Sequence, residues 1–139
     1  MKTILLLLAL SYMYPSVGQS PVNFTVYVKQ FAHQEGKLRV ALFNSEGKYL
    51  KEACREMGAE IDNLEVVSVT FEGLPSGEYA ISIYHDENGN GQLDANFMGI
   101  PTEDYAFSNN APSRFGPASY SDARIEVSTN NNTHTINLN

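Results

Sequence analysis

The chain has 139 residues, which is enough for one domain of ordinary size. Its formal net charge is −7 at pH 7, and an acidic surface repels nucleic acid and anionic lipid while it suits divalent cations. A single cysteine cannot form an internal disulfide, so we expect the core to hold the domain together, with Cys54 buried in it as a small apolar residue.

The first 18 residues have the organisation of a secretory signal peptide. Lys2 provides a short positive region, residues 4–10 an apolar run, and Ser16, Val17 and Gly18 small residues for a cleavage site. The apolar run is shorter than the roughly 20 residues that a permanent transmembrane helix needs. We therefore predict a secreted or periplasmic protein whose mature part, residues 19–139, is one domain without membrane insertion.

Alternation of apolar and polar residues dominates the mature part, as is typical of half-buried strands. It predicts six short strands, near residues 24–29, 38–43, 67–71, 79–84, 123–127 and 136–138. Between the second and third strands, the apolar residues from Gly47 to Met57 have helical spacing and predict one short helix. We expect an all-β fold, an antiparallel two-sheet sandwich of prealbumin-like or immunoglobulin-like kind, with a small closed barrel as the alternative.

A turn separates the third and fourth of these strands. Pro75 presets its own φ angle, and Gly77 can adopt a positive φ, so a tight link is predicted. Tyr79 then begins the next strand on its inward face.

The segment from Asp86 to Tyr120 has hardly any periodicity. A loop of this length in a compact domain is usually functional or disordered. Apolar residues recur throughout it and predict an ordered loop that packs over one end of the sandwich. These expected anchors are Phe97, Met98, Ile100, Tyr105, Phe107, Phe115 and Tyr120.

The start of this loop has the spacing of a calcium-binding loop. The candidate ligands are Asp86, Asn88, Asn90, Gln92 and Asp94. Calcium needs several hard oxygen ligands on a backbone that curls around one point, and Gly91 permits the sharp turn. The pattern matches the first nine positions of an EF-hand loop, with Gln92 contributing its carbonyl oxygen. We therefore predict a weak calcium site that fixes the loop.

The match fails at the closing position, where Phe97 replaces the usual bidentate glutamate. The closing ligand is then missing or comes from Glu87, Asn96, Glu103 or Asp104. A plain polar hairpin is the alternative, because Asn-Gly pairs are strong turn signals. That alternative leaves the two flanking acids, Asp86 and Asp94, unexplained.

No catalytic constellation is evident in the sequence. His85 precedes Asp86, but neighbours along a strand point to opposite faces and do not form a dyad. His33 and His134 have no spacing that suggests a zinc site. We therefore expect a protein that is not an enzyme.

A second polar cluster follows in the long loop. Asn109 and Asn110 can donate and accept, so they either clamp loop backbone or, with Tyr105 and Phe107, face a ligand. The clamp is the preferred interpretation, because a long loop leaves many backbone groups to satisfy.

Several of these motifs together resemble the DUF2141 family of bacterial exported proteins. They are Tyr84–Gly91 with Leu93 and Asp94, Gly99–Pro101, Phe107–Ala111, Phe115–Pro117, Gly73–Pro75 and Gly77–Tyr79. The resemblance extends from about the first strand to Val127. Ala106 and Ala118 stand where the family usually has Gly and Pro. Membership implies export and a β-rich fold, and it supplies no reaction.

Three functions are compatible with these features. The first is a cation-stabilised structural or binding module, with a periplasmic or cell-surface protein or glycan as its partner. The second is a small-molecule or glycan binder that uses the 105–117 loop. The third and weakest is a hydrolase that uses His85 with a carboxylate from another strand.

Overall fold

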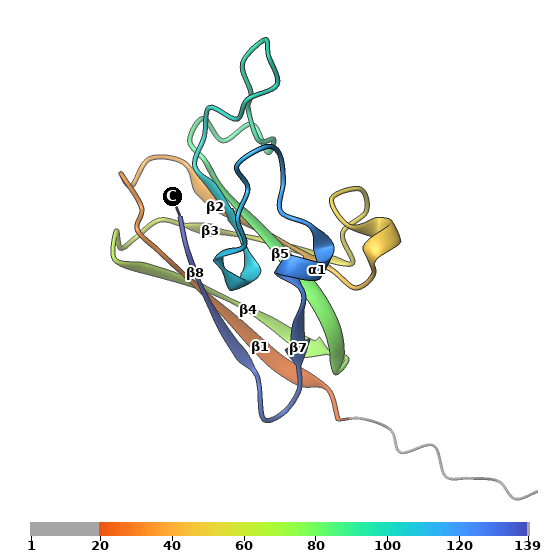
Figure 1. Ribbon diagram of the computed structural model, residues 1–139. Coiled ribbons are helices and arrows are strands. Elements are labelled where there is room, and N and C mark those ends of the chain that lie inside the picture. Colours follow the sequence, from red (N-terminus) through yellow and green to blue (C-terminus); the bar gives the residue numbers. More distant parts are fainter. Residues whose placement is uncertain (1–19, 139) are drawn as a thin grey trace, which may run out of the picture.

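The computed structural model describes residues 20–138, which form two β-sheets packed face to face (Figure 1). The predicted signal peptide, residues 1–18, lies outside the described residues. The strands are β1 (Val22–Lys29), β2 (Lys37–Phe43), β3 (Arg55–Glu60), β4 (Val66–Leu74), β5 (Gly77–Asp86), β6 (Tyr105–Phe107), β7 (Ile125–Val127) and β8 (Thr133–Asn137). The short helices are η1 (Glu46–Lys48), η2 (Ser108–Asn110) and α1 (Tyr120–Ala123). None of the helices in this part of the chain is long and apolar enough to cross a membrane.

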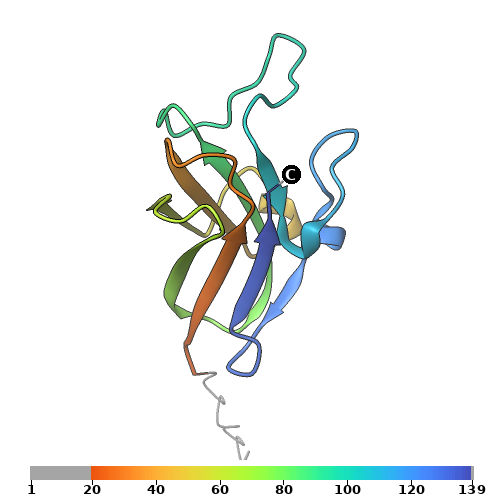
Figure 2. The same cartoon turned by 90° about the vertical axis from the view of Figure 1, so that its left-hand side faces the viewer.

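The two sheets have three and five strands. The first has the order β4-β1-β8, and Figure 2 shows these strands side by side in front of the second sheet. The second has the order β3-β2-β5-β6, with β7 pairing the beginning of β5. The predicted sandwich is confirmed. All pairings of the named strands are antiparallel except β1 with β8, which is parallel.

Alternating residues of the two sheets fill the space between them, as the period of two predicts. The largest fully buried apolar side chains are Phe24, Phe71, Leu38, Leu42, Leu74, Ile81, Ile83 and Ile136. Tyr79 also faces inward as predicted, and its hydroxyl donates to the carbonyl oxygen of Pro75 at 2.7 Å. Phe24 of β1 and Phe71 of β4 are also register partners, so two of the largest core side chains lie next to each other in the first sheet.

The predicted helix from Gly47 to Met57 is wrong. That segment contains the single turn η1 and then enters β3, where Met57 pairs with Val40. The apolar residues of this segment serve in tertiary packing instead. The Tyr49 ring packs against those of Phe43 and Tyr120, with centroids 5.4 and 5.6 Å apart. The expected burial of Cys54 is also wrong: the residue is exposed, and its Sγ donates to the Leu42 carbonyl oxygen at 3.3 Å.

The loop that follows β5 projects beyond one end of the sandwich (Figures 1 and 2). Phe107 and Tyr120 are buried in a second, smaller apolar cluster, as expected of anchors. Phe97 and Phe115, however, are fully exposed, and Met98 and Ile100 are mostly exposed. The expectation that these four residues anchor the loop is therefore wrong, and polar contacts hold its outer part instead.

Candidate metal centre

Asp86 is the last residue of β5 and lies at the base of the projecting loop. It is fully buried, and its Oδ2 accepts hydrogen bonds from Arg39 Nε and from the backbone N–H of Gly91, each at 2.9 Å. Its Oδ1 is buried without a hydrogen-bond partner among residues 20–138. A buried acceptor of this kind is costly unless some group satisfies it.

The surroundings of Asp86 keep its side chain ionised. Burial by itself raises the pKa of a carboxyl group, because it disfavours the charged form. The Arg39 guanidinium and the Gly91 amide outweigh burial, and the pKa of Asp86 lies below its ordinary value. These contacts therefore favour the ionised form of the buried Asp86 carboxyl group.

Three further predicted ligands are in direct contact. Asn88 Nδ2 donates to Asp94 Oδ2 at 2.6 Å, and Asn90 Nδ2 donates to both Asp94 oxygens at 2.9 and 3.1 Å. Asn88 Oδ1 in turn accepts from the Asn90 N–H, and Asn90 Oδ1 from the Gln92 N–H. The loop thus brings Asn88, Asn90 and Asp94 together. Asp86 is linked to the same loop because its Oδ2 accepts from the Gly91 N–H, and Gln92 is linked to it because its N–H donates to Asn90 Oδ1.

Glu103 ties the two ends of this loop together. It is buried, its Oε1 accepts from the Glu87 N–H, and its Oε2 accepts from the Asp94 N–H, both at 2.9 Å. Among the four residues considered for the closing position, Glu103 is the one that touches the backbone at both ends of the loop. Its two carboxylate oxygens are used in these backbone hydrogen bonds.

The other candidates for the closing position have different contacts. Asn96 Oδ1 accepts from the N–H groups of Met98 and Ile100, within its own turn. Asp104 contributes its carbonyl oxygen to the His85 N–H at 2.9 Å. Glu87 points toward His33, with 3.5 Å between its Oε1 and His33 Nε2.

The second polar cluster binds backbone groups. Asn109 Nδ2 donates to the carbonyl oxygens of Asp122 and Arg124 at 3.0 and 2.9 Å. Asn110 Oδ1 accepts from the Asn137 N–H at 2.9 Å. Both asparagines have positive φ angles, which their short polar side chains tolerate. Phe107 is buried against this region and Tyr105 is half-buried beside it, with their ring centroids 5.9 Å apart.

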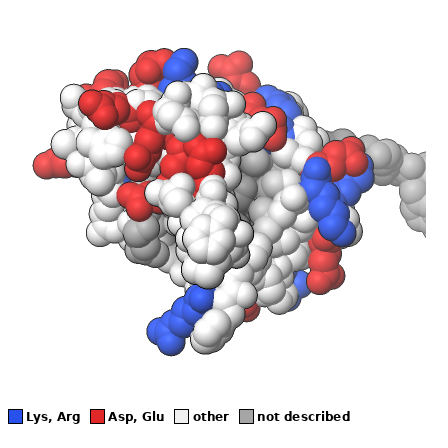
Figure 3. Space-filling model, turned by 90° about the horizontal axis from the view of Figure 1, so that it is seen from above, with Lys and Arg blue, Asp and Glu red and all other residues white. Residues whose placement is uncertain are grey.

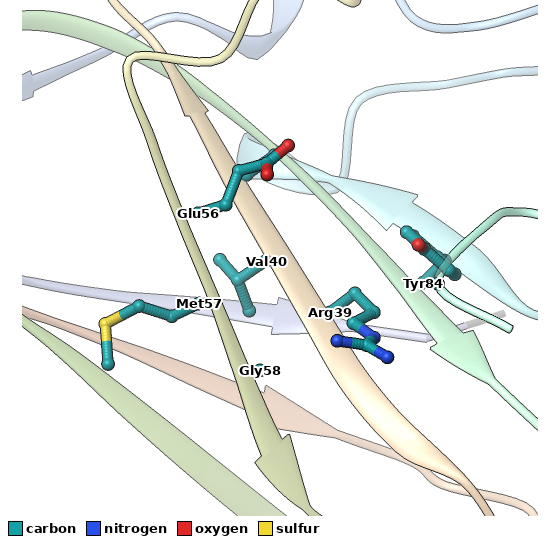
Figure 4. Close-up of a pocket in the computed structure, with 8 residues that line it drawn as sticks. Arg39, Val40, Glu56, Met57, Gly58 and Tyr84 are labelled. Atoms are coloured by element: carbon teal, nitrogen blue, oxygen red, sulfur yellow. The ribbon is translucent and has the colours of Figure 1, made fainter. Parts of the chain in front are cut away.

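A shallow hollow of about 220 Å³ lies on the outer face of the second sheet, next to the loop. Figure 4 shows Arg39, Glu56 and Tyr84 around it, each from a different neighbouring strand. Gly58 of β3 lies beside the Arg39 side chain, where a Cβ would make an ordinary contact at 3.4 Å from Arg39 Nη1. Arg39 therefore connects this hollow with Asp86.

Acidic side chains are concentrated at the loop end of the molecule. Figure 3, which views this end from above, shows Asp and Glu side chains grouped on one part of it with few Lys or Arg between them. The sequence pattern did not reveal Arg39, which reaches Asp86 from 47 positions away. It named Glu103 only as one of four possibilities, because loop closure depends on the path of the chain between residues 94 and 103.

The fold and the site define a β-sandwich domain with an oxygen-rich loop at one end of its longest strand. Residues 26–135 match the family described as uncharacterized proteins conserved in bacteria (DUF2141), and the chain belongs to that family. Neither the curated proteins nor the solved structures contain a significant match to this sequence.

Proposed function

We propose that this protein is an exported structural or binding module, of the periplasm or cell surface, whose loop from Asp86 to Asp94 binds a calcium ion. The observation that carries the proposal is the buried Oδ1 of Asp86, a charged acceptor without a partner among residues 20–138. Calcium supplies what this oxygen lacks, because it accepts several oxygen ligands in a flexible geometry.

The remaining ligands are within the same loop. Asp94 contributes a second carboxylate, and Asn88 and Asn90 can turn their amide oxygens inward in place of the amide nitrogens that now contact Asp94. The short Asn88–Asp94 contact of 2.6 Å shows how closely these groups are drawn together. The ion would fix the loop rather than transmit a signal.

The affinity should be weak. Arg39 already compensates part of the charge of Asp86, so the loop offers a cation less than two full negative charges. Sites with few carboxylates in extracellular modules have dissociation constants on the order of 10⁻⁴ to 10⁻³ M.

Thermal unfolding in EDTA, in calcium and in magnesium tests this proposal. Calcium at about 100 times its dissociation constant should stabilise the protein by about 2.7 kcal/mol. Magnesium should have a much smaller effect, because it requires a stricter geometry. Asp94→Asn should remove most of the calcium increment while it preserves the shape of the side chain.

Asp122→Asn is the matched control. Asp122 is exposed in α1, and its replacement changes the net charge by the same amount as Asp94→Asn. The proposal requires that Asp122→Asn keep the full calcium increment. Equal increments in the wild type and in both variants would show that calcium acts on the general acidic surface and would refute a site in the loop.

A further inference from the structure

We propose that His33, His85 and Glu87 form a second metal site, for a divalent transition-metal ion of the zinc class. Each of these residues offers one ligand atom, and the three atoms lie within 4.8 Å of one another. Ligand atoms around a tetrahedral zinc ion are about 3.3 Å apart, given bond lengths of about 2.0 Å. Adjustments of about an ångström would therefore close the site.

The fold brings these residues together in two ways. His85 is in β5 and Glu87 directly follows its last residue, and their ligand atoms lie together with that of His33, whereas the Asp86 side chain contacts Arg39 and Gly91. The loop of residues 30–36 supplies His33 and packs closely on the same place. A Cβ on Gly36 would lie only 2.1 Å from the Asp86 carbonyl oxygen and 2.6 Å from Glu87 Cα.

The hydrogen bonding of His85 suits a metal ligand. It is fully buried, and its Nε2 lies 2.6 Å from the carbonyl oxygen of Glu35, so Nε2 carries the proton. The lone pair is then on Nδ1, which is buried without a hydrogen-bond partner among residues 20–138. Metal-binding histidines commonly donate their other N–H to a backbone carbonyl in this way, which fixes both tautomer and ring orientation. Phe31 packs edge-on against the ring and holds it further.

His33 and Glu87 complete the set from the solvent side. His33 Nε2 and Glu87 Oε1 are 3.5 Å apart, close to the spacing of two ligands on one zinc ion. The His33 ring centroid lies 4.7 Å from that of His85. The side chains of His33 and Glu87 are 39% and 40% exposed, so they can move toward an ion and leave its fourth position open to water.

This site differs from the calcium loop in chemistry and in position. Two imidazoles and one carboxylate suit zinc, copper or nickel, whereas calcium prefers oxygen ligands alone. The side chain of Asp86 lies on the other face of β5 and contacts Arg39 and Gly91. The two sites can therefore be occupied or lost independently.

Zinc titration of the protein, monitored by calorimetry with calcium at saturation, tests the inference. The wild type should bind one zinc ion, and His33→Gln and Glu87→Gln should each weaken binding by more than about tenfold. Both residues are partly exposed, so these variants should fold normally. His134→Gln, which removes the third histidine, and Asp94→Asn, which alters the calcium loop, should bind zinc as the wild type does.

Imidazole ¹⁵N spectra of the same samples locate the ion directly. Zinc should shift the ring nitrogens of His33 and His85 and leave those of His134 unchanged. The inference is overturned if the wild type does not bind zinc stoichiometrically, if the His33 and Glu87 variants bind it equally well, or if His134 responds as strongly as His85. Loss of calcium binding with retained zinc binding would contradict the proposed function and leave this site intact.

Discussion

The buried Ser108 side chain links the backbone of two different elements in this domain. Its fully buried hydroxyl accepts from the Ile81 N–H at 2.9 Å and donates to the Ala123 carbonyl oxygen. It lies where β5 is paired neither with β6 nor with β7, so it supplies the bond that the sheet lacks there.

Ser108→Ala should therefore destabilise the protein by about 1–3 kcal/mol, because it leaves the buried Ile81 N–H unpaired. Urea unfolding measures the change. Ser68→Ala is the control, since Ser68 is exposed on β4 and its replacement should alter stability by less than about 0.5 kcal/mol. Equal losses in the two variants would contradict the assigned role.

Sequence spacing located the residues of the acidic loop because all of them lie within nine positions. It did not locate the cluster of His33, His85 and Glu87, since 52 positions separate His33 from His85. His85 and Asp86 contact different groups, Glu35 and Arg39, and form no dyad; the carboxylate that we propose acts with His85 is that of Glu87, just beyond the end of β5. Long-range contacts of this kind follow from the path of the 30–36 loop, which the residue pattern does not specify.

At the level of elements, two connections are each made by only a few residues. β8 is joined to η2 by two hydrogen bonds: His134 Nε2 accepts the Asn109 N–H at 3.0 Å, and Asn110 Oδ1 accepts the Asn137 N–H at 2.9 Å. The 30–36 loop contacts the end of β5 through Gly36, which has a φ of +80°, and through the Glu35 carbonyl oxygen, which lies 2.6 Å from His85 Nε2. Neither connection belongs to a strand ladder.

The His134 contact predicts a dependence of stability on pH. Burial lowers the pKa of His134 below its ordinary value of 6.5, and protonation of Nε2 would break the bond to Asn109. The unfolded chain therefore binds a proton at a higher pH than the folded one, and stability should fall as the pH decreases below about 6.5. His134→Gln keeps an acceptor without titrating, so it should reduce this dependence. Unfolding free energies in EDTA at about pH 7.5 and about pH 5 measure it; an unchanged dependence in the variant would refute the assignment.

Gly36→Ala should separate the 30–36 loop from β5. A side chain at this positive φ costs about 1–2 kcal/mol, and the collision with the Asp86 carbonyl adds to that cost. Gly47→Ala is the matched control, because a Cβ at Gly47 meets nothing within 4 Å. Comparison of the two variants by denaturant unfolding checks the prediction, which fails if both are equally stable.

Elements with an alternating apolar pattern could be predicted, and edge elements could not. β3 is an edge strand whose residues are exposed except for Ala59, so it has no apolar face to reveal it. β6 contains three residues, too few for a period to appear. The helical spacing near Tyr49 reflects packing on the second apolar cluster instead of a helix.

In the molecule as a whole, the polar clusters lie at one end of the sandwich. The core lies between the sheets, while the oxygen-rich loop, the histidine cluster and the exposed Phe97 lie at or beyond the end of β5. Composition predicted the acidic surface, and alternation predicted the sandwich. The parallel pairing of β1 with β8 was not predicted, because the order of strands in a sheet depends on how the chain crosses between the layers.

The proposal that calcium occupies the loop after β5 can be tested by amide chemical shifts during a calcium titration. We expect the Gly91 and Asp94 resonances to shift and saturate at millimolar calcium, because their N–H groups donate to Asp86 and Glu103 at the base of the loop. Resonances of the opposite end, such as those near Ser128 and Asn131, should stay in place. Shifts that are absent, or that spread over the acidic surface without saturating, would contradict the claim.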